Sequence, residues 1–347
     1  DNGTLILVFL GRNQDGVFLL NEGRWHDFNR FVFPEMDKVR DIIHIALDPG
    51  NPARAWASAW DGGLLEFNRD GFVNLYDTTN SSLRLRAEHQ DNLRVGGAAV
   101  DRDGNVWVSN SEVPRPLSVR KANGEWLSFS SAGVLAANQI TGRIVIDTYN
   151  QKWMILPVGG GIYLFRENSL NNANDFQARK LSTAAGQGGL PGNNVSAIAV
   201  DQNGYVWVAT DEGVVVFYSP QRAFSGEPFN AQQIIVEQDG FAGYLFGNET
   251  VNCITVDGSN KKWFGTARSG AFLLSADGRE TIFHFTTRNS PLLSDHIRDI
   301  SIDGQTGEVF FATDKGLVSF RGLATSGGRT HSEVYAFPNP EIGRAHV

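Results

Sequence analysis

The chain has 347 residues, of which 41% are hydrophobic and 20% charged, and its formal net charge is −8 at pH 7. This acidic balance argues against nucleic acid as a partner, because nucleic-acid binding needs Lys and Arg to neutralise phosphates. No apolar run approaches the length of a membrane span. The single cysteine, Cys253, excludes a disulfide framework, and we expect it to be a small buried hydrophobic residue.

The N-terminal segment, residues 4–30, is predicted to form three β-strands, with Gly16 and Trp25 in the places of a third and a fourth strand. A first strand is missing, so Asp1 is expected to open midway through a unit of the fold. We therefore expect the chain to be a piece of a longer protein, with any targeting segment upstream.

From residue 39 onward one phrase recurs, in which an apolar strand is followed by an aspartate, a tight turn and a tryptophan. In "VSAIAVDQNGYVWVATDEGVVVFY" these are Asp201, Gly204 and Trp207. Phe310 replaces the tryptophan in the last repeat. The equivalent aspartates lie 46 to 56 positions apart and are Asp48, Asp101, Asp147, Asp201, Asp257 and Asp303. Self-similarity at a period near fifty is typical of propellers and other repeat arrays.

Each repeat contains short β-branched runs such as "VSAIAV", "YVWVAT" and "GVVVFY", and a fourth run follows around Trp25, Trp126 or Phe283. Four antiparallel strands in about fifty residues make a propeller blade. Six repeats and the incomplete N-terminal blade together predict an all-β fold, a seven-bladed β-propeller of four-stranded antiparallel blades, over residues 1–326. Residues 327–347 are predicted to be a linker and the start of a truncated C-terminal β-sandwich. The last seven residues, 341–347, match no earlier part of the sequence.

The repeated aspartate is predicted to be structural rather than catalytic. Its carboxylate can accept backbone N–H bonds in the turn that follows, and Gly204 supplies the positive φ that closes such a turn. Asn150 and Asn260 replace glycine in two repeats, and asparagine tolerates the same conformation. The tryptophan is predicted to fill the space between neighbouring blades.

The repeats resemble the two-component-regulator type of propeller repeat, whose consensus reads V-x-x-I-x-x-D-x-x-G-x-x-W-x-x-T-x-x-G. The segments Thr78–Leu83 and Thr286–Leu293 resemble the connector between blades of that family. "VYAFPNP", Val334–Pro340, resembles the opening of the C-terminal domain found in proteins that use the type IX secretion system. Together these segments resemble the second propeller of the PorZ-like accessory proteins of that system.

This resemblance implies a non-catalytic protein that carries two propellers and a small β-sandwich and works with a sortase and anionic lipopolysaccharide. It implies a secreted location, at the outer cell surface or in the periplasm of a Gram-negative bacterium. The implied partners are a protein of the secretion machinery, an anionic glycan, or both, and no cofactor is implied. Two alternatives stay open: a periplasmic oligosaccharide-sensing propeller of a hybrid two-component system, and a propeller lyase of the streptogramin-inactivating kind.

The candidate binding residues follow from the repeat register. Turns between second and third strands and connectors between blades open on one face of a propeller, and function on repeat scaffolds tends to lie in such loops. The turns place Arg12, Trp60, Asp61, Glu112, Arg115, Asp211, Glu212, Arg268 and Lys315 on this face, and the connectors place Arg94, Arg288, Asp295 and His296 there. A solvated rim without a specific ligand is the alternative.

Five of these residues, Arg12, Arg268, Arg288, His296 and Lys315, are predicted to form a cationic sector for an anionic glycan, because arginine matches carboxylate and phosphate geometry. If the chain were a lyase, His296 would be the candidate base, with Glu249 in the preceding connector. No metal site is predicted, since the histidines lack ligand spacing. Asp101–Asn105 lacks the distal glutamate of a calcium loop.

Overall fold

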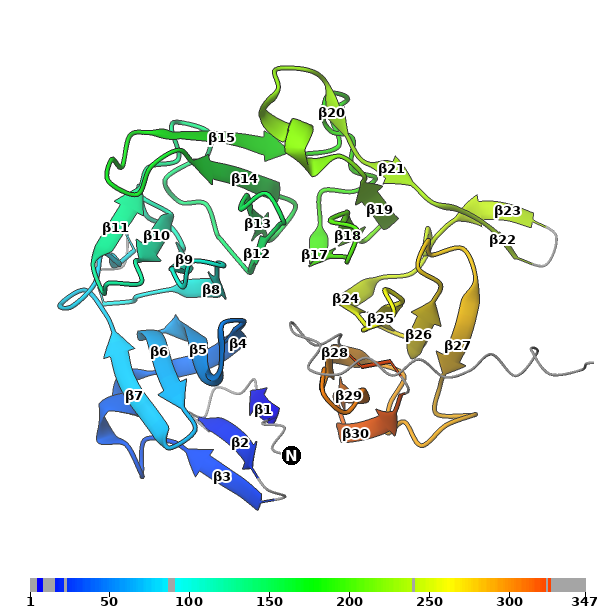
Figure 1. The fold of residues 1–347 in the computed structure, drawn as a ribbon, viewed down its shortest axis with the longest axis horizontal. Helices are drawn as coiled ribbons and strands as arrows, with labels where there is room; N and C mark the ends of the chain where they lie inside the picture. The colour runs from blue at the N-terminus through cyan, green and yellow to red at the C-terminus, as the bar shows by residue number, and fades with distance from the viewer. Residues whose placement is uncertain are drawn as a thin grey trace, which may run out of the picture.

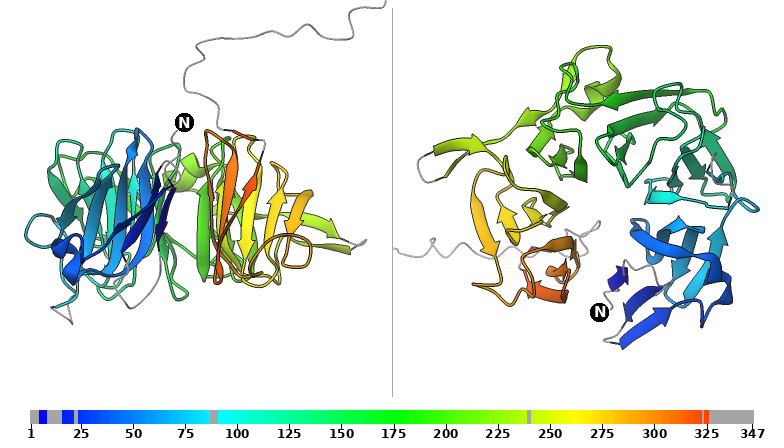
Figure 2. Two further views of the ribbon diagram at one scale, coloured as in Figure 1. Left: turned by 90° about the horizontal axis from the view of Figure 1, so that it is seen from below. Right: turned by 180° about the vertical axis from the view of Figure 1, so that it is seen from behind.

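The structure, a computed structural model, describes residues 5–8, 16–21, 24–86, 91–238, 241–322 and 324–325. Antiparallel sheets stand side by side in a ring, each running from the centre outward (Figure 1). In the side view the strands stand upright and the loops gather at two opposite faces (Figure 2). The all-β propeller architecture with four-stranded antiparallel blades is therefore confirmed.

Within the ranges that the structure describes, five sheets have four strands each. From the centre of the ring outward they are β4 (Arg40–Asp48), β5 (Asn51–Asp61), β6 (Gly63–Asn68) and β7 (Gly71–Tyr76); β8 (Val95–Val100), β9 (Val106–Asn110), β10 (Leu117–Arg120) and β11 (Trp126–Phe129); β12 (Ile144–Ile146), β13 (Lys152–Leu156), β14 (Gly161–Glu167) and β15 (Phe176–Leu181); β17 (Val195–Val200), β18 (Val206–Thr210), β19 (Gly213–Phe217) and β21 (Gln232–Gln233); and β24 (Val251–Val256), β25 (Lys262–Thr266), β26 (Ala271–Leu274) and β27 (Thr281–Phe285).

The remaining elements are shorter or incomplete. Two sheets have three strands: β1 (Leu5–Val8), β2 (Val17–Asn21) and β3 (Arg24–Phe28), and β28 (Ile297–Ile302), β29 (Glu308–Thr313) and β30 (Gly316–Arg321). β16 (Gln187–Gly188) pairs in parallel with β20 (Phe229–Asn230), and β22 (Ile235–Gln238) forms a projecting hairpin with β23 (Phe241–Tyr244) (Figure 1). The helices in the described ranges are two 3₁₀ turns, η1 (Pro34–Lys38) and η2 (Pro220–Phe224).

The described residues show six of the seven predicted blades, if a blade is counted as a sheet that begins with its own inner strand. These six are the six aspartate repeats. Among the described residues, the N-terminal sheet consists of β1, β2 and β3, which pair with one another, and no described strand lies on the inner side of β1. One face of this sheet still packs like a blade, since Val17, Leu19 and Phe28 join the core of the β4–β7 blade. The predicted linker and sandwich, 327–347, lie outside the described residues.

The aspartate turn has the predicted structural role. Asp201 Oδ1 accepts the backbone N–H groups of Asn203 and Tyr205 at 2.9 and 3.0 Å, and Oδ2 accepts the indole N–H of Trp207 at 3.0 Å. Asp101 and Asp147 bind the tryptophans of their repeats in the same way. The positive φ falls on glycine at 104 and 204 and on asparagine at 150 and 260, as predicted.

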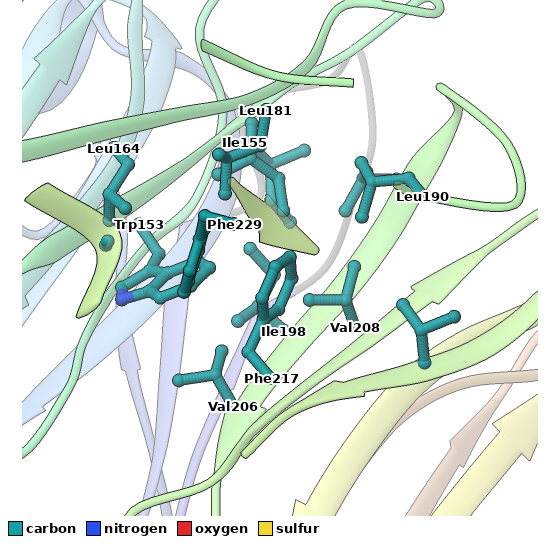
Figure 3. Close-up of a cluster of buried hydrophobic side chains, with 14 residues drawn as sticks. Trp153, Ile155, Leu164, Leu181, Leu190, Ile198, Val206, Val208, Phe217 and Phe229 are labelled. Carbon is teal, nitrogen blue, oxygen red and sulfur yellow. The ribbon is translucent and has the colours of Figure 1, made fainter. Parts of the chain in front are cut away.

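The repeated tryptophan packs between neighbouring blades, which confirms its predicted place. Trp153 of β13 shares one buried cluster with Ile198, Val208 and Phe217 of the next blade (Figure 3). Trp207 is 1% exposed and shares another cluster with residues of the β24–β27 blade. Each such interface excludes water from a large apolar surface, so blade-to-blade packing rather than a single central core stabilises the ring.

Two buried lysines also cross blade interfaces. Lys262 of β25 is fully buried and its ammonium lies 2.9 Å from Asp201 Oδ2 in the preceding blade. It also lies 4.7 Å from the centre of the Trp207 ring. Lys152 of β13 is placed alike, 3.9 Å from the ring centre of Trp107, and binds Glu167 at 2.5 Å. Buried ammonium groups need such partners because desolvating an unpaired charge is costly.

The inner strands share a bulge that links each blade to the next. The register shifts by one residue in β17 at Ser196 and in β24 at Asn252. The Ser196 hydroxyl donates to the Val251 carbonyl and the Asn252 amide to the Ile297 carbonyl at 2.8 Å, both in the following blade. A bulge re-aims a side chain out of the regular pleat, which allows these hydrogen bonds between sheets.

Candidate binding face at the loops between blades

A repeated threonine shapes the turns that carry the candidate residues. Thr210, Thr266 and Thr313 end the second strands of three blades, and each hydroxyl donates to the carbonyl of the glycine that begins or precedes the third strand, at 2.8–3.0 Å. The same hydroxyl accepts a backbone N–H from inside the turn, at 2.9–3.1 Å. The turn tips between them carry the predicted residues Asp211, Glu212, Arg268 and Lys315.

On the opposite side of the ring, the turns of the β4–β7 and β8–β11 blades meet the connector between them. Glu112, in the β9–β10 turn, binds two arginines of this connector. Arg86 lies 2.6 Å from Oε1 and Arg94 lies 2.5 Å from Oε2. The Arg94 guanidinium also stacks 4.9 Å from the ring centre of Trp60, in the β5–β6 turn. We call Trp60, Arg86, Arg94 and Glu112 the arginine–glutamate cluster.

Asn110 holds the backbone beneath this cluster in place. This side chain is fully buried, and its amide donates to the carbonyls of Arg84 and Arg94 at 3.1 and 3.0 Å. Its oxygen accepts the Arg84 N–H at 2.7 Å. Asn110 occupies the place that threonine has in the later repeats. Its longer amide side chain binds the backbone at both Arg84 and Arg94, which a threonine hydroxyl is too short to do.

Burial and nearby positive charge act in opposite directions on the pKa of Glu112 and on the pKa of Asp61, the residue after Trp60. Burial raises the pKa of Glu112, but hydrogen bonds and charge from Arg86 and Arg94 outweigh it and lower the pKa below its ordinary value. The pKa of Asp61 is raised, first by burial, although the Leu93 N–H and the charges of Arg40 and Arg94 pull it down. Glu112 is therefore the firmly ionised partner of the two arginines.

The predicted cationic sector is open and little connected. Arg268, Arg288 and Lys315 are exposed, and in the described part of the chain their side chains form no ion pair or hydrogen bond. Asp295 accepts the backbone N–H of Thr287 at 2.7 Å, so its carboxylate is bound to the backbone of the connector in which it lies. Arg12 lies outside the described residues.

Other predicted residues have local partners. Asp211 accepts the Asn194 amide at 2.7 Å, and Arg115 donates to the Ser128 carbonyl on the outer strand β11 at 2.8 Å. The hydrogen bond of Glu249 comes from the Ser269 hydroxyl at 2.6 Å. Among the described contacts none joins Glu249 to His296, so the structure does not bring a lyase-like pair together.

Two residues of this face are absent from the sequence-based candidates. Arg86 is one, although Leu85–Arg86 has the same two residue types as Leu93–Arg94, later in the same connector. Asn110 is the other, and no sequence signal separates it from an ordinary strand residue. Within the described ranges no group of three or more His, Cys, Asp or Glu side chains is arranged to hold a metal. In the same ranges no helix is long and apolar enough to cross a membrane.

Comparison with known proteins agrees with this architecture. A family described as "Two component regulator propeller" matches residues 189–212, which contain the Asp201 repeat. PorZ of Porphyromonas gingivalis, described as an essential bacterial surface component of the type IX secretion system, superposes with a TM-score of 0.78 at 25% sequence identity. In fold, the chain is PorZ-like. The similarity covers 94% of this chain and 46% of PorZ, so the PorZ-like propeller spans less than half the length of that protein.

More distant structures share the fold alone with this PorZ-like propeller. The extracellular domain of a hybrid two-component system from B. thetaiotaomicron has 17% identity and a TM-score of 0.59, over 88% of this chain and 37% of that one. Virginiamycin B lyase from Staphylococcus aureus has 11% identity and a TM-score of 0.57, over 91% of this chain and 98% of the lyase. Among curated proteins, none matches the sequence.

Proposed function

We propose that this chain is a non-catalytic binding or scaffolding propeller that acts outside the cytoplasm as an accessory component of type IX secretion. The observation that carries the proposal is the similarity to PorZ, which covers nearly the whole chain and not one repeat. PorZ is described as a surface component, and the second fold relative is an extracellular domain, so both support an extracytoplasmic location.

The loop face is the surface through which we expect partners to bind. It combines two exposed arginines and one exposed lysine, Arg268, Arg288 and Lys315, with the ordered arginine–glutamate cluster on the other side of the ring. For the cationic sector the ligand we propose is an anionic glycan or a glycolipid headgroup. Binding there should weaken steeply with salt, because a Debye length of about 8 Å at physiological ionic strength screens exposed charges.

We further infer that the N-terminal sheet counts as the seventh blade. Its strands β1, β2 and β3 pair in the order of second, third and fourth strands, and they pack against the β4–β7 blade as a preceding blade would. An added inner strand beside β1 would complete it.

The experiment that tests the proposed function is deletion of the gene in its source bacterium, with surface proteins measured by mass spectrometry. Loss of type IX cargo from the surface, restored by the full-length gene, is the expected result. Unchanged cargo display together with altered transcription after oligosaccharide feeding would instead support the sensor alternative and overturn the proposal.

A further inference from the structure

The inner strands of neighbouring blades are joined by side chains that donate to backbone carbonyls. Asn252 of β24 donates to the Ile297 carbonyl at 2.8 Å, and Thr255 of the same strand donates to the Ile300 carbonyl at 2.7 Å. Each inner strand is the edge of its own sheet and forms no backbone ladder with the next inner strand. Backbone carbonyls at such an edge therefore take their partners from side chains of the preceding blade.

β28, the inner strand of the last described blade, has donors at the same two places. Arg298 stands five residues before the repeat aspartate and Ser301 two residues before it, the places of Asn252 and Thr255 in β24. The register of β28 also shifts at Arg298, so this strand carries the same bulge. Both side chains are exposed, and in the described part of the chain neither forms a hydrogen bond or an ion pair. The bulge thus re-aims a donor as in the other blades, with no described strand to receive it.

The sheet of β28, β29 and β30 is open on the face that the other blades have covered. Trp207 and Trp263 are 1% and 2% exposed, and each shares a buried cluster with an isoleucine of the next inner strand, Ile254 or Ile300. Phe310 has the place of these tryptophans in β29 and is partly exposed. The uncovered place beside Phe310 therefore corresponds to one apolar side chain of an inner strand.

The negative charge on this face is already compensated. Asp299 of β28 has the place of Cys253 in β24, which is 2% exposed, whereas the Asp299 side chain is 53% exposed. Its carboxylate lies 3.6 Å from the guanidinium of Arg143, on β12 across the centre of the ring (Figure 1). A strand that covers Asp299 therefore buries an ion pair, and it avoids the larger cost of burying an unpaired charge.

β1 provides a second edge for the same strand. The N-terminal sheet follows the sheet of β28–β30 around the ring (Figure 1), and no described strand pairs with the inner edge of β1. An extended segment at this edge would form an antiparallel ladder with β1 and present carbonyls to β28. Strand addition of this kind takes its affinity from main-chain hydrogen bonds and its specificity from pockets for alternate side chains.

We propose that the ring binds one separate extended polypeptide segment between β28 and β1. Arg298 and Ser301 donate to its backbone carbonyls, and its fourth residue packs on Phe310. The segment has the pattern of the other inner strands, with a β-branched residue first and an isoleucine fourth, as in Val195–Val200. This inference rests on the proposed assignment of the N-terminal sheet as the seventh blade, and it adds the side chains that recognise the strand and the sequence that they require.

The test is addition of a synthetic peptide, NVSAIAVD, which copies residues 194–201, to the 347-residue protein. Fluorescence anisotropy of the labelled peptide should show binding, and the melting temperature of the protein should rise, because a ligand of the native state stabilises it. Arg298→Ala and Ser301→Ala should each weaken binding roughly three- to tenfold, as the loss of one hydrogen bond does. Arg102→Ala, at an exposed arginine in the aspartate turn of another blade, is the matched control and should bind the peptide like the parent protein.

Thermal unfolding of each variant without peptide shows that it is folded. A peptide with Ile198→Asp and a scrambled peptide of the same composition should both fail to bind, and equal binding of either one would overturn the site. Unchanged affinity in both alanine variants would overturn it as well. Binding that appears only in the Val334→Asp protein would show that the chain's own C-terminal segment fills this place, which contradicts a separate strand. Peptide binding together with unchanged cargo display after gene deletion would uphold this site and reject the proposed secretion function.

Discussion

The buried ion pair between Lys262 and Asp201 offers the sharpest test of how the ring is held together. Both side chains are fully buried, in neighbouring blades, and the ammonium lies 2.9 Å from the carboxylate. The same ammonium donates to the carbonyls of Asn260 and Ala276 at 2.8 and 2.5 Å, so all three of its donors are used. Lys262→Met removes the charge and leaves the Asp201 carboxylate in the interface without its counterion.

Removing one partner of a buried pair costs about 3–5 kcal/mol, because the remaining charge is uncompensated. We therefore expect the free energy of unfolding of Lys262→Met, measured by urea denaturation, to fall by that amount. Lys261→Met is the matched control, since the neighbouring ammonium has no partner among the described residues, and its change should stay within about 0.5 kcal/mol.

A double-mutant cycle with Asp201→Asn identifies the cause. If the cost comes from the unpaired carboxylate, the double variant should lose about 2 kcal/mol less than the sum of the two single variants. Additive losses within about 0.5 kcal/mol would refute the reasoning, because they would show that the two groups do not stabilise one another across the interface.

Three further predictions concern the core, the cluster and the chemistry. Trp207→Ala should lower the free energy of unfolding by about 3–5 kcal/mol, as large core truncations do. Trp25→Ala, at a residue that is 50% exposed, should lower it far less. Equal melting temperatures for the two variants would contradict the interblade placement of Trp207. Because the pKa of Glu112 is lowered in the folded protein, its contribution to stability is present above the ordinary value of 4.5 and is lost as pH falls through the lowered pKa. Glu112→Gln should therefore flatten the acid limb of a stability–pH profile, and an unchanged limb would argue against the ion pairs. Purified protein should not open macrocyclic lactones, and turnover that disappears in His296→Ala would overturn the non-catalytic assignment.

The sequence by itself was sufficient for the local rules of the fold. Asp201, Gly204 and Trp207 interact within one turn and its two strands, so their fixed spacing predicted the aspartate turn, the positive φ and the interblade tryptophan. Strand periodicity likewise predicted the four strands of five repeats, including the outer strand at Trp126. These features depend on residues close together in the chain, where hydrogen bonding and burial follow from residue type and spacing.

The tertiary structure alone decided which charged residues meet across blades. Nothing in "KKW" distinguishes Lys261, which is partly exposed, from Lys262, which is fully buried beside an aspartate of another repeat. Arg86 and Glu112 are 26 positions apart and meet only because a connector crosses the turn of the following blade. The sequence predicted an N-terminal blade without a first strand, but the blade count depended on which sheets form among the described residues. Such contacts depend on how the sheets pack around the ring. The spacing of residues within one repeat does not predict this packing.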